Sequence, residues 1–169
     1  NQMQVEYRHL APVLDDVLQA RLLILNPWLA TAPGGISAVL IELRKLINDD
    51  LLPANKAFWE QVVHRSDIQL KDIEGKPRSV RVFDAGDAAN NDFHVVDQYV
   101  GCNADGDIFR PDLLLFVNGL PLAIIECKAS HHRLDEALGQ LDGYQNSFPT
   151  QFVFNQVCVG LNRRDGLYG

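Results

Sequence analysis

Hydrophobic positions follow two different periods along the chain. Between residues 10 and 63 they recur at intervals of three and four, which predicts helices. Breaks at 26–27 and 33–35 separate the first two helices, and the segment 53–55 precedes a third, short helix. About residues 1–65 are therefore predicted to be helical.

From residue 68 onward the pattern changes to short runs rich in β-forming residues. A turn at 74–76 predicts a hairpin, and Asn118-Gly119 predicts a second one. The predicted strands are 68–73, 79–83, 93–100, 108–117, 122–128 and 151–161, and a helix at 133–147 should pack on the sheet. The sequence thus predicts one α/β domain, with its sheet core at about 66–169.

Composition and net charge limit the kinds of function that this protein can have. The 169 residues are 47% hydrophobic, which is enough for one domain with a core. The formal net charge of −7 argues against a uniformly basic surface that grips nucleic acid, so any DNA-facing part must be local. The final residues have turn chemistry, and we interpret them as the edge of a fragment.

Localisation is predicted from what the sequence lacks. Cys102, Cys127 and Cys158 have no paired spacing, which fits a reducing compartment and implies no structural metal. The first residues do not have the pattern of a signal peptide, and no apolar run reaches the roughly 20 residues of a membrane span. We therefore expect a cytoplasmic protein without a membrane partner.

Candidate chemistry lies on two neighbouring predicted strands. Asp112 opens one, and Glu126-Cys127-Lys128 ends the other. Because side chains alternate along a strand, Glu126 and Lys128 should share a face, and Cys127 should offer its backbone carbonyl nearby. Two carboxylates and a carbonyl suit Mg²⁺, which can activate a water for attack on a phosphodiester.

This chemistry requires a particular strand register. A two-residue loop at Asn118-Gly119 would pair Asp112 with Ile125 and place the two carboxylates on opposite faces. We therefore predict a three-residue loop, Asn118 to Leu120, or an equivalent bulge. On spacing alone, a solvated strand end with a Glu/Lys pair is the favoured interpretation.

The stretch RPDLLLFVNGLPLAIIECK, with NNDFHVVDQYV before it and EALGQLDGYQ after it, closely resembles the N-terminal nuclease domain of the HsdR subunit of type I restriction-modification enzymes. The resemblance covers nearly the whole chain. It implies a PD-(D/E)xK restriction-endonuclease-like core, a mixed β-sheet flanked by helices. It also implies that Asp112, Glu126 and the Cys127 carbonyl hold Mg²⁺, while Lys128 orients the attacking water.

The resemblance also assigns a supporting pair, Gln140 and Tyr144, to a Q-x-x-x-Y element. Residues four apart are neighbours on a helix, so the pair could order DNA or the metal site; the alternative is an ordinary helix flank packed on the sheet.

Some positions depart from the family pattern or leave alternatives open. Cys127 replaces the usual apolar residue, and Asp97 stands where the family commonly has Asn. An acid on the first helix often completes such sites; Asp15 or Asp16 is a candidate, Glu42 a weaker one, and the alternative for each is an exposed helix carboxylate. The two histidines at 131–132 could contact DNA phosphate, but the favoured interpretation is that they are solvated turn residues.

The function implied is a Mg²⁺-dependent endonuclease domain, a type I site-specific deoxyribonuclease that cleaves double-stranded DNA. In the family, the full-length subunit carries an ATP-dependent translocase motor and works with methylation and specificity subunits. ATP use would then lie outside these residues, which would be a fragment of the motor subunit. Two alternatives stay open: a catalytically silent docking module, and a standalone repair nuclease or junction resolvase.

Overall fold

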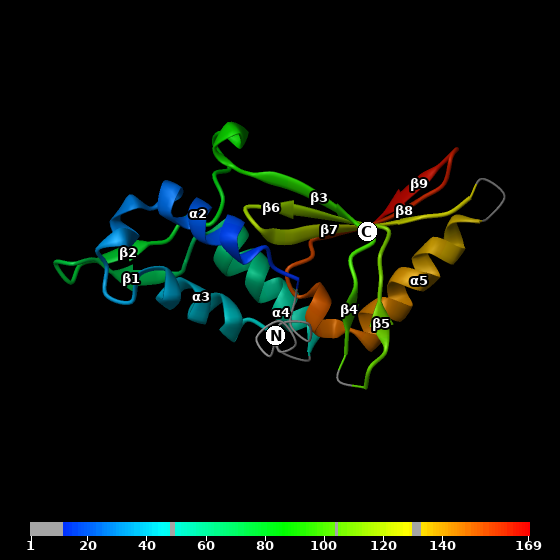
Figure 1. The fold of residues 1–169 in the computed structure, drawn as a ribbon, viewed down its shortest axis with the longest axis horizontal. Helices are drawn as coiled ribbons and strands as arrows, with labels where there is room; N and C mark the ends of the chain where they lie inside the picture. The colour runs from blue at the N-terminus through cyan, green and yellow to red at the C-terminus, as the bar shows by residue number, and fades with distance from the viewer. Residues whose placement is uncertain (1–11, 48–49, 104, 130–132) are drawn as a thin grey trace.

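The computed structural model describes residues 12–47, 50–103, 105–129 and 133–169. The first half is helical, as predicted (Figure 1). Its elements are α2 (Asp15–Leu25), η2 (Pro27–Ala30), α3 (Gly35–Lys45), α4 (Leu51–Phe58) and η3 (Trp59–His64). Helix α4 begins before Pro53, not after it as predicted, because the first-turn N–H groups of a helix have no partner within the helix and proline is tolerated there.

The described residues of the second half form three sheets. A hairpin of β1 (Gln69–Lys71) and β2 (Pro77–Ser79) confirms the first predicted turn. The main sheet has the order β3-β6-β7-β8-β9, and only β7 and β8 pair in parallel among its strands. The remaining elements are η4 (Ala88–Asn90), β3 (Phe93–Asp97), β4 (Gly101–Cys102), β5 (Ile108–Phe109), β6 (Leu113–Val117), β7 (Leu120–Cys127), α5 (Leu134–Ser147), η5 (Pro149–Phe152), β8 (Val157–Leu161) and β9 (Gly166–Tyr168).

Several strand predictions need correction. The second strand of the first hairpin is β2 at Pro77–Ser79, not 79–83 as predicted. The run 108–117 is two strands, because Pro111 lacks an N–H and interrupts the ladder, so β5 pairs with β4 instead of joining the main sheet. The run 151–161 starts as the helical turn η5, and only its second part, β8, is a strand. The turn-like ending forms β9, which pairs antiparallel with β8.

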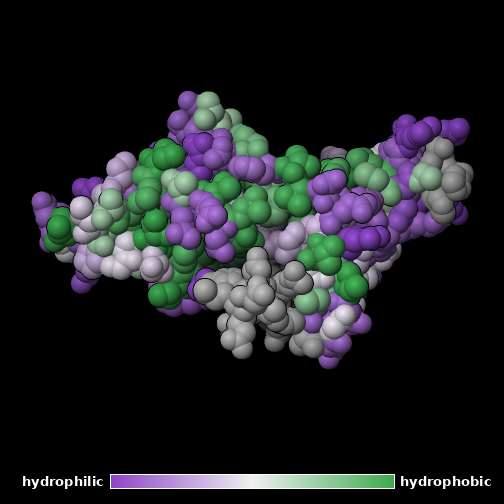
Figure 2. All heavy atoms as spheres, viewed as in Figure 1, coloured by the Kyte–Doolittle hydropathy of each residue, from purple (hydrophilic) through white to green (hydrophobic). Residues whose placement is uncertain are grey.

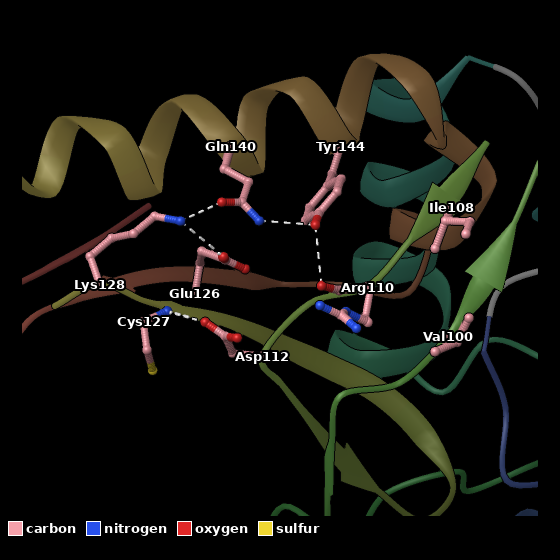
Figure 3. Close-up of a pocket in the computed structure, with 9 residues that line it drawn as sticks. All are labelled: Val100, Ile108, Arg110, Asp112, Glu126, Cys127, Lys128, Gln140 and Tyr144. Carbon is pink, nitrogen blue, oxygen red and sulfur yellow. Dashed lines mark hydrogen bonds and ion pairs between the residues drawn. The ribbon is translucent and has the colours of Figure 1, made fainter.

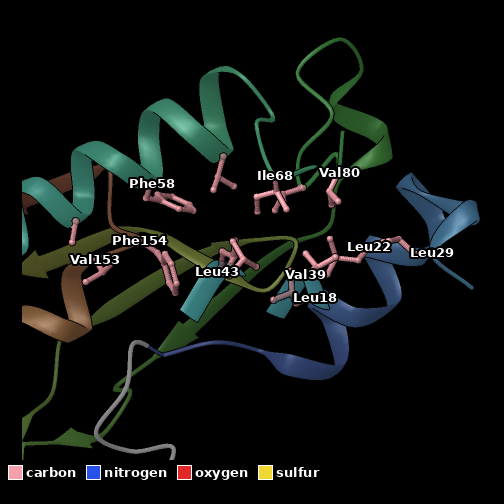
Figure 4. Packing of buried hydrophobic residues seen from close by; sticks show 14 residues of the cluster. Leu18, Leu22, Leu29, Val39, Leu43, Phe58, Ile68, Val80, Val153 and Phe154 are labelled. Carbon is pink, nitrogen blue, oxygen red and sulfur yellow. The ribbon is translucent and has the colours of Figure 1, made fainter. Parts of the chain in front are cut away.

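Two hydrophobic clusters hold the chain together. The larger one joins the helical half to the sheet through Leu18, Val39, Phe58, Leu120 and Phe154 (Figure 4). The smaller one lies between α5 and the main sheet and includes the buried side chains Phe109, Leu114, Phe116, Ile124 and Leu141. Helix α5 connects the parallel strands β7 and β8 and therefore covers one face of the sheet. None of the helices in the described ranges is long and apolar enough to cross a bilayer.

The β6–β7 hairpin combines a tight turn with a bulge. Val117 pairs with Leu120 across the two residues Asn118 and Gly119, which both have positive φ (51° and 84°). The predicted three-residue loop is therefore wrong. The equivalent bulge is confirmed: the pairing passes from Pro121 to Ala123 and leaves Leu122 without a partner on β6.

Gly119 allows the first helix to approach this turn. The Leu14 N–H donates to the Gly119 carbonyl at 2.9 Å, and a Cβ built on Gly119 would lie 2.6 Å from the Leu14 carbonyl oxygen and 2.8 Å from the Leu18 nitrogen. Helix α2 is thus held at the turn end of the hairpin by a contact that only glycine permits.

Replacement of Gly119 by alanine should destabilise the fold by about 2 kcal/mol or more, because strain at positive φ adds to a clash with backbone. Gly75→Ala is the matched control, since Gly75 has a similar φ of +80° and no atom within 4 Å of the added Cβ. It should cost about 1 kcal/mol. Thermal unfolding of both variants measures the difference, and equal losses would contradict the close docking of α2.

Candidate active site

A pocket of about 570 Å³ opens between the ends of β6 and β7 and one side of α5. It is lined by Val100, Ile108, Arg110, Asp112, Glu126, Cys127, Lys128, Gln140 and Tyr144 (Figure 3). Five of these nine are the side chains for which the sequence predicts a role, and Cys127 is the residue whose carbonyl was predicted to help. Strands and a helix that are far apart in sequence therefore bring the candidate residues together.

The bulge at Leu122 sets the relative position of the two carboxylates. Leu113 pairs with Ile125, and continuing this register by one residue brings Asp112 opposite Glu126. The Cys127 N–H donates to Asp112 Oδ2 at 2.7 Å, which fixes the Asp112 side chain against the end of β7. Since the N–H and C=O of one strand residue point to the same side, the Cys127 carbonyl also faces Asp112. The thiol of Cys127 points away from the pocket in Figure 3.

A line of hydrogen bonds crosses the pocket from Lys128 to the backbone of Arg110. Lys128 Nζ donates to Glu126 Oε1 at 3.2 Å and to Gln140 Oε1. Gln140 Nε2 donates to the Tyr144 hydroxyl at 2.9 Å, and that hydroxyl donates to the Arg110 carbonyl at 3.2 Å. Each polar group thereby orients the next, so the ammonium of Lys128 is held beside Glu126.

Glu126 is the most perturbed acid in this pocket. Its residue is 3% exposed, and Oε2 has no hydrogen-bond partner in the described part of the chain. Burial first, and then the negative charge of Asp112, raise the pKa of Glu126, while Lys128 opposes the shift. A buried carboxylate oxygen without a partner is costly, so a water or a cation at this position would stabilise it.

The donor set fits a magnesium ion. Magnesium is usually bound by one or two carboxylates and keeps several waters, and Asp112, Glu126 and the Cys127 carbonyl supply such hard oxygen ligands at one point. Among the described residues no group of three or more His, Cys, Asp or Glu side chains is arranged to hold a metal. A site here would therefore depend on two carboxylates, a carbonyl and water.

Three lining residues were not singled out by the sequence. Val100 and Ile108 are 55% and 65% exposed, and they border the pocket beside the β4–β5 hairpin. Arg110 has an exposed side chain for which the structure shows no ion pair with any described carboxylate. Its place two residues before Asp112 is the signal that could have identified it.

The structure does not bring the candidate accessory acids to the pocket. Asp15 and Asp16 form the first turn of α2 at the turn end of the hairpin, separated from Asp112 by the length of β6, about 17 Å at 3.4 Å per residue. Burial, the largest cause, raises the pKa of Asp15. Glu42 forms an ion pair with Lys45 on α3, with Lys45 Nζ 2.6 Å from Glu42 Oε1. The pair at 131–132 lies outside the described residues.

The fold defines a class: a mixed α/β domain, consistent with a nuclease-like fold, in which an Asp, a Glu and a Lys lie at adjoining strand ends. The family model described as the N terminus of the type I restriction enzyme R protein matches residues 1–169. The chain belongs to this family.

Two curated relatives agree with the family match. The chain is 25% identical to the putative type I restriction enzyme MjaIXP endonuclease subunit of Methanocaldococcus jannaschii, over 100% of its own length and 17% of that protein. It is 29% identical to the type I restriction enzyme HindI endonuclease subunit of Haemophilus influenzae, over 80% of its own length and 13% of that protein. The chain thus spans less than a fifth of the length of these two relatives.

Proposed function

We propose that this chain is the Mg²⁺-dependent endonuclease domain of a type I restriction R subunit, with a PD-(D/E)xK core, and that it hydrolyses phosphodiester bonds of double-stranded DNA. The observation that carries the proposal is the pocket in which Asp112, the unpartnered Oε2 of Glu126 and the ammonium of Lys128 converge. ATP-driven translocation would reside elsewhere in the subunit, and the methylation and specificity subunits would be its partners.

Six of the nine residues that line the pocket have a role in this proposal. Asp112 and Glu126 would bind the ion with the Cys127 carbonyl. When bound, Mg²⁺ lowers the pKa of a coordinated water and offsets phosphate charge. Lys128, held by Glu126 and Gln140, would orient the attacking water and stabilise the charge that develops on the phosphate. Tyr144 would keep Gln140 in place through its hydroxyl.

The test is Asp112→Asn in the full-length subunit assembled with its partners. Asparagine retains an oxygen that accepts the Cys127 N–H but removes the charge that would bind the ion. Plasmid cleavage should fall by about 10³-fold or more, since losing metal-ion stabilisation costs several kcal/mol. ATP hydrolysis should persist.

Asp142→Asn on the exposed side of α5 is the matched control and should cleave normally. Binding of Mn²⁺, measured as a shift in the thermal unfolding temperature, distinguishes a nuclease from a docking module. A docking module would bind no ion at this pocket. Unchanged cleavage by Asp112→Asn would exclude the proposed site.

A further inference from the structure

One face of the main sheet is largely hydrophobic, and neither hydrophobic cluster of the described residues covers it. Leu114, Phe116 and Ile124 point toward α5 and are buried, whereas the alternate residues of the same strands stay half-buried or exposed. We call this second surface the open face and define it by the hydrophobic residues of two cross-strand rows, Val95, Leu115 and Ala123 in one and Leu113, Ile125 and Val159 in the other; the exposed Asp97 forms the edge of the second row.

The sequence of the strands indicates burial on both faces. A strand with one face in water alternates hydrophobic and polar residues, but β6 reads Leu-Leu-Leu-Phe-Val without a polar position. The open face nevertheless belongs to neither hydrophobic cluster of the described residues. Val95 is 65% exposed at its edge. Figure 2 shows hydrophobic residues gathered over α2 and the neighbouring strands, in contrast to the hydrophilic end at β9.

We propose that the open face is covered, in the full-length subunit, by polypeptide of that same subunit outside residues 1–169. In the two curated relatives, this chain corresponds to 17% and 13% of the protein, so a subunit of such length has ample additional chain. A covalently attached segment acts at a high effective concentration. A second copy is disfavoured, because each copy carries a formal net charge of −7.

The occupant should present a hydrophobic layer, because a sheet face of this kind is stably buried against the apolar stripe of a helix. It would complete the second side of the sheet that holds Asp112 and Glu126. The inference rests on the family membership and on the burial pattern, not on catalysis, so it stands or fails separately from the proposed nuclease activity.

The test compares two cysteine variants of the full-length subunit, Val95→Cys and Ile73→Cys. In the 169 residues, Val95 is 65% exposed and Ile73 71% exposed, so nearly equal labelling by a thiol reagent is expected at both sites if nothing covers the sheet. If the open face is covered, labelling at position 95 should be slower by about tenfold or more, because it requires local opening. Peptide mass spectrometry reads each site separately from other cysteines.

Three further measurements identify the occupant: labelling after dilution, labelling with and without the other subunits, and labelling after deletion of residues 1–11. Protection of position 95 that persists on dilution, without other subunits and after deletion of residues 1–11, supports the proposal. Equal labelling at 95 and 73 overturns it. Protection that disappears on dilution identifies a second copy, protection that needs an added subunit identifies a partner, and protection lost with residues 1–11 identifies that segment; each of these results overturns the proposal.

Discussion

Replacement of Glu126 by glutamine is expected to abolish DNA cleavage and, at the same time, to stabilise the metal-free fold. The carboxylate is 3% exposed, its Oε2 lacks a partner among the described residues, and Asp112 adds a second negative charge. Glutamine removes the buried charge, so unfolding should shift upward by about 2–4 °C, which corresponds to about 1 kcal/mol in a domain of this size. The same change removes a proposed ligand of Mg²⁺.

The sign of the pH dependence follows from the raised pKa of Glu126. An acid whose pKa is raised by folding destabilises the fold when it is ionised, so the advantage of glutamine should be full above the raised value. It should disappear below the ordinary pKa of glutamate, where both states are protonated. Thermal unfolding between acidic and neutral pH measures this gap.

Glu60→Gln is the matched control for charge removal, because the Glu60 side chain is 47% exposed, far more than that of Glu126, and lies 3.9 Å from Lys56. It should change stability little and leave cleavage intact. Added Mg²⁺ should raise the unfolding temperature of the unaltered protein but not that of Glu126→Gln. A loss of stability in metal-free Glu126→Gln, or a Mg²⁺ response equal to that of the unaltered protein, would rule out the proposed role.

Replacement of Lys128 by alanine should separate metal binding from catalysis. Lys128 competes for Glu126 through its 3.2 Å contact, so its removal should leave Mg²⁺ binding intact or stronger. Cleavage should nevertheless fall by about 10²–10³-fold, the typical cost of losing one group that stabilises transition-state charge. Metal titration and single-turnover plasmid cleavage on the assembled complex measure the two effects.

Lys76→Ala is the matched control, since Lys76 also pairs with a glutamate two residues away, Glu74, at 2.7 Å, but on an exposed turn. That variant should cleave normally. If Lys128→Ala cleaved DNA at the rate of Lys76→Ala, Lys128 would be only a structural partner of Glu126.

The register of the β6–β7 hairpin could be predicted from the sequence. Asn118-Gly119 marks the turn, and the requirement that Asp112 and Glu126 share a face demands one extra residue. The sequence did not decide between a longer loop and a bulge. Pro121 provides a physical reason for the bulge, because it cannot donate a ladder hydrogen bond and the pairing is irregular beside it.

Other features depend on contacts that a linear pattern does not contain. The hydrophobic run at 152–154 predicts a strand, yet it lies at the end of η5 and in the turn that follows, because a short apolar run does not distinguish a strand from other buried segments. The position of Asp15 depends on the docking of α2 against Gly119, about a hundred residues away in the chain, as shown by the 2.9 Å bond from Leu14. A helix periodicity alone does not reveal which end of a sheet the helix contacts.

The unpaired Leu122 determines how the site responds to a change in chain length, which substitutions do not test. Deleting this one residue would bring the pairs Phe116–Pro121 and Leu115–Ala123 into direct succession, so the hairpin would become regular and Asp112 would stay opposite Glu126. Between Asp112 and Glu126, sequences descended from a common ancestor should therefore keep the activity when they lose one residue together with the bulge, whereas a single insertion should require a second bulge to keep both carboxylates on one face.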